Sequence, residues 1–283
     1  MGRSARQLRL VEEHALHELL GRKRSTRLEA SGVCVHERFL YVVFDDSRNV
    51  AKIERRLRSG DRRHRLLPNR THRVGFEDVT FHPGLARFLC VLEAMERPKK
   101  PGHYRPRIEE YDEKLRFVGD AWVDLDVARA NKGIEGLSHV RRGGIDYVLG
   151  LWESSRKRAR LPVFQKGVKR WERIATLELP KSVRFDDYSC VSVDGDRIAV
   201  ASQESSAVWI GRLAKGKLAF EGKGTTYLFP RSSKGRVRYC NVEGVAWMSP
   251  RRLVVVSDRC KKRKQSKRCC ERDQSIHVFE IPR

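Results

Sequence analysis

A pattern that recurs five times along the chain limits the folds that it can adopt. Each copy consists of a polar residue, a short apolar run, a turn, a second apolar run and an acidic residue. Two β-prone runs joined by a turn predict a hairpin, and further strand-like runs such as WERIATLEL follow the hairpins. The copies begin 46, 58, 54 and 54 residues apart, at Ser31, Glu77, Glu135, Ser189 and Glu243.

Four strands in each unit of roughly 50 residues are typical of a β-propeller. We therefore predict an all-β, single-domain propeller over residues 1–283, with five blades or, if a degenerate unit is hidden in the longer copies, six. The last copy ends after a third strand, so segment 1–30 is expected to supply the fourth strand and close the ring. Helical periodicity is weak except in Gln7–Leu20.

Positive charge is concentrated in three segments. The chain has 60 Lys and Arg against 36 Asp and Glu, a net charge of +24, and nearly all of the excess falls within 48–73, 155–173 and 251–272. Such a field attracts anions, including phosphate esters and nucleic acid. Aromatic residues do not interleave with the basic residues of the loops SSRKRARLP (154–162) and RCKKRKQSKRCCERDQ (259–274), which disfavours base-specific nucleic-acid recognition.

The seven cysteines do not form a recognisable framework. The chain shows neither a secretion signal nor an apolar run long enough to span a membrane, so we expect a cytoplasmic monomer without structural disulfides. Cys34, Cys90 and Cys190 lie in apolar runs and are expected in the core. Cys260, Cys269 and Cys270 lie in a basic loop, where free thiols, a zinc site or a reversible disulfide remain open.

Two columns of polar residues are expected to meet at one face of the propeller, because the first strand of a blade begins where the second ends. The first column includes Glu77, Glu135 and Glu243, and oxygen ligands from several loops suit Ca²⁺, then Mg²⁺ or Mn²⁺. The alternative is a structural role, with the acids hydrogen-bonded to backbone or paired with Arg and Lys. The second column and its neighbours, expected to bind substrate, are Asp45 (or Asp46), Glu93, Lys132, Glu153, Glu204, Asn241 and Asp258.

Standard catalytic motifs are absent from the sequence. It contains no GxSxG, P-loop, HExxH or Rossmann glycine pattern. The catalytic residues therefore remain unassigned. Histidines at 36, 82, 139 and 277 lie in or beside strands and are expected to be structural, as are the five tryptophans, which we expect to pack between blades.

Several motifs resemble those of a known group of propellers. GFEDVTF, GIEGL and NVEGVAW followed by LVVVSD resemble the pattern of the SdiA-regulated and phytase-esterase-like propellers, and FDDYSCVSV and SQESSAVWIGRL resemble bacterial propellers of unknown function. The resemblance implies a divalent-cation site, often calcium, and in some branches phosphoester or lactone hydrolysis. Carried over by position, the cation ligands would be Glu77, Glu135 and Glu243, whereas Ser31 and Ser189 depart from the pattern.

The sequence thus predicts a cation-binding propeller that binds or hydrolyses a small anionic ligand at its central mouth. The alternative is a non-enzymatic scaffold whose basic loops bind an acidic protein or nucleic acid.

Overall fold

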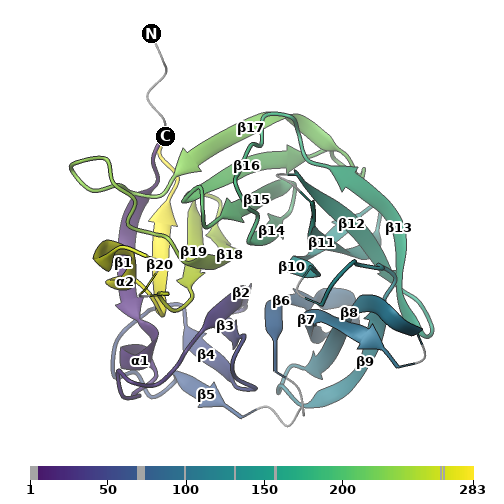
Figure 1. Cartoon of the computed structure of the whole chain (residues 1–283), viewed down its shortest axis with the longest axis horizontal. Coiled ribbons are helices and arrows are strands. Elements are labelled where there is room, and N and C mark those ends of the chain that lie inside the picture. Colours follow the sequence, from purple (N-terminus) through teal and green to yellow (C-terminus); the bar gives the residue numbers. More distant parts are fainter. Residues whose placement is uncertain are drawn as a thin grey trace.

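Antiparallel sheets stand around a central axis like the blades of a propeller, which confirms the predicted fold class (Figure 1). A computed structural model of the chain describes residues 6–68, 74–98, 100–130, 132–155, 158–261, 263 and 265–283, apart from the side chains of 153–155 and 158. Runs rich in valine, leucine and aromatic residues, such as FLYVVF and RLVVVS, form the strands, as their β-propensity predicts.

The described residues form three four-stranded sheets and one eight-stranded sheet. The first sheet comprises β2 (Ala30–His36), β3 (Phe39–Phe44), β4 (Val50–Glu54) and β5 (Arg65–Leu67). The eight-stranded sheet comprises β6 (Phe76–His82), β7 (Arg87–Arg97), β8 (Lys100–Asp112), β9 (Phe117–Val123), β10 (Ile134–Arg142), β11 (Ile145–Ser155), β12 (Arg158–Lys166) and β13 (Arg170–Glu178). Its two halves meet through a short parallel pairing of β13 with β9.

The other two sheets complete the ring. One comprises β14 (Cys190–Asp194), β15 (Arg197–Ser202), β16 (Ala207–Leu213) and β17 (Phe220–Leu228). The last comprises β18 (Val242–Ser249), β19 (Arg252–Ser257), β20 (Ser275–Glu280) and β1 (Arg9–Ala15). The inner strands β2, β6, β10, β14 and β18 contact one another in a closed circle, and we interpret the ring as five-bladed.

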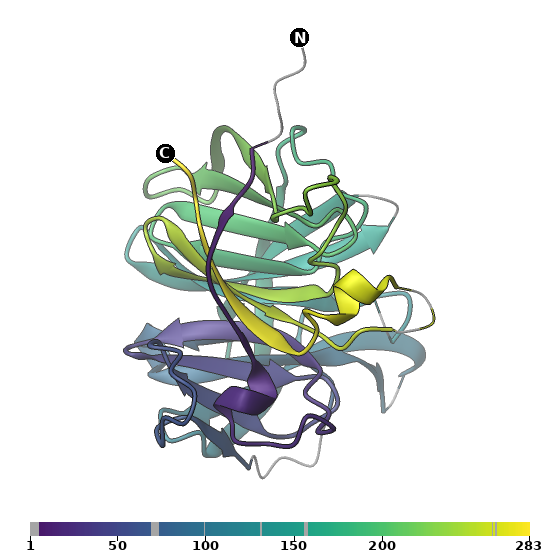
Figure 2. The ribbon, with the colours of Figure 1, turned by 90° about the vertical axis from the view of Figure 1, so that its left-hand side faces the viewer.

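The N-terminal segment closes the ring as a strand. β1 pairs antiparallel with β20 from Arg9–Glu280 to Ala15–Ser275 and runs beside it on the outside of the molecule (Figure 2). Only the short helix α1 (Leu16–Leu19) reflects the helical periodicity of Gln7–Leu20. The strand forms because β20 would otherwise present an unpaired edge.

Side-chain hydrogen bonds join neighbouring inner strands. Ser31 Oγ of β2 donates to the Phe76 carbonyl of β6, and the Thr80 hydroxyl of β6 accepts from the His139 N–H of β10, at 3.0 Å. Ser138 Oγ of β10 in turn accepts from the Val193 N–H of β14, at 2.8 Å. These bonds satisfy backbone groups that face a neighbouring inner strand and not a hydrogen-bonded partner strand of their own blade.

Glycines allow the inner strands to approach closely. A Cβ added to Gly136 of β10 would lie 2.6 Å from the Val191 backbone nitrogen of β14, whereas one added to Gly119 of β9 meets nothing within 4 Å. We expect Gly136→Ala to lower the free energy of unfolding by about 1–3 kcal/mol, because backbone must shift. Gly119→Ala, the matched control, should change it by less than about 0.5 kcal/mol in urea titrations. Equal losses would contradict the close approach.

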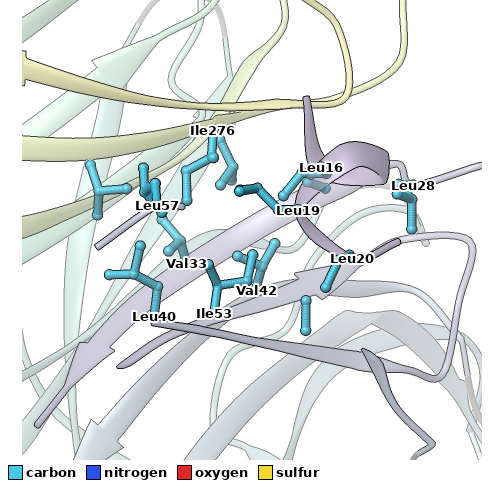
Figure 3. Close-up of a cluster of buried hydrophobic side chains, with 14 of the residues drawn as sticks. Leu16, Leu19, Leu20, Leu28, Val33, Leu40, Val42, Ile53, Leu57 and Ile276 are labelled. Carbon is cyan, nitrogen blue, oxygen red and sulfur yellow. The ribbon is translucent and has the colours of Figure 1, made fainter. Parts of the chain in front are cut away.

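Apolar clusters fill the spaces between neighbouring blades. Leu16, Leu19 and Leu20 gather with Val33 and Ile276, so α1 helps to join the last blade to the first (Figure 3). The predicted packing role of tryptophan fits Trp171 and Trp209, which are fully buried, and Trp247, which is 6% exposed. Trp122 and Trp152 are only half-buried. Cys34, Cys90 and Cys190 are buried and free, as predicted.

Candidate functional site

In four of the five inner strands, the polar residue near the start of the strand is displaced from regular pairing. The register of β2, β6, β10 and β18 shifts at the start, so that Ser31, Glu77, Glu135 and Glu243 are the extra residues of β-bulges. A bulge leaves one residue unpaired and redirects its side chain. These bulges therefore place the polar residues at the end of the ring where the inner strands begin; they are Ser31, Glu77, Glu135 and Glu243. We call this end the axial mouth.

Two of the predicted cation ligands have strongly perturbed carboxyl groups. Burial raises the pKa of Glu77 well above its ordinary value, and Glu135, Asp45, Glu93 and Glu243 raise it further. The pKa of Glu243 is raised by burial and then by Asp258, Glu135 and Asp187. Because like charges act on one another strongly only at short range, the structure brings Glu77, Glu135 and Glu243 into one acidic cluster.

The second column surrounds this cluster in part. A Cβ on Gly75 would lie 3.9 Å from Glu93 Oε2 and 4.0 Å from Asp45 Oδ1, so these two carboxylates flank the same glycine. Burial and neighbouring acids raise the pKa values of both. Burial likewise raises the pKa of Asp258 to about 6, with Glu29 and Asp45 adding to it.

The remaining predicted residues have different surroundings. Glu204 lies exposed in a turn after β15, and Lys132 is also exposed. Asn241 is buried and its Oδ1 accepts from Gln265 Nε2 at 2.5 Å. The Glu153 side chain lies outside the described residues.

Two acids that the repeat pattern does not identify also act on the cluster. Asp187 raises the pKa of Glu243, and Glu29 raises the pKa values of Asp45 and Asp258. Both precede the first strand of a blade, where loop length varies between copies, so alignment of the hairpins does not reveal them.

Asp78 is a deeply buried acid that sequence reasoning missed. It is 1% exposed, its Oδ2 accepts from the Leu137 N–H of β10 at 2.7 Å, and its Oδ1 accepts from the Val79 N–H at 2.8 Å. Burial raises its pKa to about 8. Asp78 and Cys190 occupy positions where other inner strands have Gly32, Gly136 and Gly244, and this aligned position is the signal that identifies Asp78.

Lys261 acts on several acids of the mouth. It lowers the pKa values of Glu243, Asp258 and Asp45, whereas the pKa of Glu77 is raised most, after burial, by Glu135, Asp45, Glu93 and Glu243. Two buried polar atoms nearby, Ser189 Oγ and Asn241 Nδ2, have no hydrogen-bond partner within the described structure. Buried polar atoms are normally satisfied by protein, water or ligand.

The fit of a divalent cation to this mouth is partial. Its donors are carboxylate oxygens, which suit Ca²⁺. In the part of the chain that the structure describes, however, no three Asp, Glu, His or Cys side chains are grouped closely enough to hold a metal ion. The calcium prediction therefore rests on donor chemistry, not on a formed coordination sphere.

A separate axial cavity lies toward the other ends of the inner strands. It has a volume of about 470 Å³ and is lined by residues 33–37, 79–81, 137–139, 191–194 and 245–248, with Arg55 and Pro83. Asp78 lies between Glu77 of the mouth and Val79 of the cavity wall. The cavity contains none of the predicted site residues, and we place the candidate site at the mouth because the unusual charges are there.

The expectation that structural disulfides are absent is wrong for four cysteines. The structure pairs Cys240 with Cys269 and Cys260 with Cys270. The segment 259–274, which joins β19 to β20 and which we call the clasp loop, has no buried apolar side chains other than Cys260 and Cys269 among its described residues. Disulfides commonly order segments that lack a core.

A serine, a histidine and a glutamate form a buried relay in the closing blade. His277 Nε2 lies 2.9 Å from Ser257 Oγ, and Nδ1 lies 3.0 Å from Glu13 Oε2. This order resembles a hydrolytic triad. Ser257 and His277 are 1% and 0% exposed, so a substrate does not reach the hydroxyl, and the relay instead joins β19, β20 and β1. Its role matches the structural role predicted for His277.

Comparisons with known proteins support the fold. No family model matches the chain, and no curated protein matches it. Because no family model matches, the resemblance to SdiA-regulated propellers stays a prediction. Among the described residues, no helix is both long and apolar enough to cross a bilayer.

Three solved structures illustrate the likeness. A PQQ-bound aldose sugar dehydrogenase from Streptomyces coelicolor is 10% identical, with a TM-score of 0.53 over 96% of this chain and 98% of that one. The calcium-binding protein regucalcin from Agrobacterium tumefaciens is 11% identical, with a TM-score of 0.52 over 99% and 98%. A xylose complex of a GH43_1 enzyme from Xanthomonas citri is 10% identical, with a TM-score of 0.52 over 94% and 89%. At these identities the likeness shows the propeller fold alone.

Proposed function

We propose that the protein binds a divalent cation, Ca²⁺ before Mg²⁺ or Mn²⁺, at the axial mouth and thereby binds a small anionic ligand. The observation that carries this proposal is that Glu77 and Glu243 are half-buried at the mouth and that neighbouring acids, Glu135 among them, raise their pKa values. Such a group gains stability from a bound cation, because the alternative is to take up protons. Glu77, Glu135 and Glu243 would hold the cation.

Hydrolysis of a phosphoester or lactone is the reaction that best fits such a mouth. A bound cation would supply positive charge that polarises a phosphoryl or carbonyl oxygen. Asp258, with a pKa of about 6, exchanges a proton close to neutral pH and suits the role of general base. Ser189 Oγ and Asn241 Nδ2 are polar atoms without partners that would bind ligand oxygens after a small rearrangement.

Calorimetry of CaCl₂ binding to chelator-treated protein tests the cation site. We expect micromolar affinity, and a stabilisation of about 2.7 kcal/mol when free Ca²⁺ is 100 times the Kd. The double variant Glu135→Gln/Glu243→Gln should lose the binding because it removes two charged donors. Glu178→Gln on outer strand β13, where the side chain is exposed, is the control and should bind as the wild type. Absence of heat and of thermal stabilisation in the wild type would assign the acids a structural role.

The second candidate is a scaffold whose basic loops bind an acidic protein or nucleic acid. It is favoured by the concentration of positive charge in 155–173 and 251–272. Binding through these loops would weaken steeply with salt, because phosphate contacts release counterions. Binding at the mouth would instead depend on Glu135 and Glu243, so the same double variant separates the two candidates.

A further inference from the structure

The clasp loop is anchored beside the axial mouth by sulfur. Cys240–Cys269 joins it to the segment before β18, and Cys260–Cys270 closes the loop on itself. Its hydrogen bonds to the rest of the chain include Gln265 Nε2 to Asn241 Oδ1 at 2.5 Å. Lys261, which follows Cys260 directly, is the cation that acts on Glu243, Asp258 and Asp45.

A cavity of about 740 Å³ gives access to one of these disulfides. Cys270 lines it, between the clasp loop and the segment that follows α1, and Cys270 is more exposed than its partner Cys260, which is 6% exposed. Both signs of charge line the cavity. The cations are Arg24, Arg27 and Arg259, and the acids are Glu18, Glu271 and Asp273.

This lining matches a small zwitterionic thiol. Arginines bind carboxylates through paired hydrogen bonds, and carboxylates bind an ammonium group. A volume of this size accommodates a ligand of a few hundred daltons. Asp273 Oδ2 also accepts from the Cys260 N–H at 2.9 Å, so one wall of the cavity is bonded directly to the disulfide.

We propose that this cavity binds a small peptide thiol carrying carboxylate and ammonium groups, which exchanges with the Cys260–Cys270 disulfide and thereby opens the clasp loop. The thiolate attacks Cys270 Sγ, and Cys260 leaves as a thiolate that takes up a proton. A second thiol molecule attacks the sulfur of the first, releasing Cys270 and a small-molecule disulfide. Two thiols are oxidised and one protein disulfide is reduced by two electrons; the reverse reaction restores the clasp.

Reduction rates test the exchange site. We would measure, by alkylation and mass spectrometry, the rate at which reduced glutathione opens Cys260–Cys270. The rate would be divided by the rate of the same thiol with a model disulfide. The normalised rate would then be compared with that of the uncharged thiol 2-mercaptoethanol. We expect glutathione to be favoured at least about tenfold, and Arg24→Gln to remove most of that preference. Arg173→Gln, an exposed arginine on β13, should keep it. Equal normalised rates, or seven free thiols in the untreated protein, would overturn the proposal.

Discussion

The Asp78→Asn variant is expected to be more stable than the wild type at pH 9 and less stable at pH 5. In the folded chain Asp78 keeps its proton up to a pH of about 8, whereas an unfolded aspartate loses it near 4. Between these values the native state binds more protons than the unfolded state. The free energy of unfolding therefore falls as the pH rises, by up to about 1.4 kcal/mol for each pH unit.

Asparagine at position 78 removes this pH dependence but also removes a hydrogen-bond acceptor. Its side chain does not ionise, so the contribution of residue 78 to the slope disappears. Its amide nitrogen does not accept a hydrogen bond, so either the Leu137 N–H or the Val79 N–H loses its acceptor, at about 1–3 kcal/mol. The stability curves of variant and wild type should cross between the two pH values.

Urea unfolding at intervals from pH 5 to pH 9, with chelator present, measures both effects. The Asp78→Asn variant should retain some pH dependence because the pKa values of Glu77 and Glu243 are also raised. Glu178→Gln, on the exposed face of β13, should leave the slope unchanged. Parallel stability curves for Asp78→Asn and wild type would show that the buried carboxyl is not the source of the pH dependence.

Removal of residues 1–15 is expected to abolish the cooperative fold. The deletion takes away β1, leaves β20 with an unpaired edge and removes Leu8 from the core between the last two blades. It also removes Glu13, which accepts from the His277 ring and contacts Tyr239. An open propeller exposes both an apolar surface and a strand edge, which favours aggregation.

Circular dichroism melting and size-exclusion chromatography measure the loss. A synthetic peptide of residues 6–15 added during refolding should restore a compact, cooperatively melting species, because a free strand can pair with a sheet edge. Arg9→Gln removes only the exposed ion pair with Glu280 and should cost no more than about 1 kcal/mol. A truncated chain that melts like the wild type would show that β1 is dispensable.

The hairpins could be predicted from sequence because their signals are local. Runs such as FLYVVF and RLVVVS are β-prone on their own, and their turns lie between them in the chain. The same copies placed Glu77, Glu135 and Glu243 in one column, and the structure brings these residues together. Whether they bind a cation remains a prediction.

The sequence is least informative where distant segments decide the outcome. It predicts that segment 1–30 supplies the closing strand, but the bounds of that strand depend on pairing with β20, which lies near the other end of the chain. Cys240 and Cys269 are 29 residues apart, and their pairing depends on the fold of a loop without regular spacing. Asp78 could have been found, since it stands where three other copies have glycine, but this requires knowing that the position faces the axis.

The pairing of β1 with β20 also has a consequence for synthesis of the protein. Arg9 and Glu280 are 271 positions apart. At ribosomal rates of about 5–20 residues per second, β1 waits roughly 15–50 s for its partner. Throughout that time the nascent chain carries an unsatisfied strand and an incomplete blade, so dependence on chaperones that shield emerging chains should be greatest just before β20 emerges.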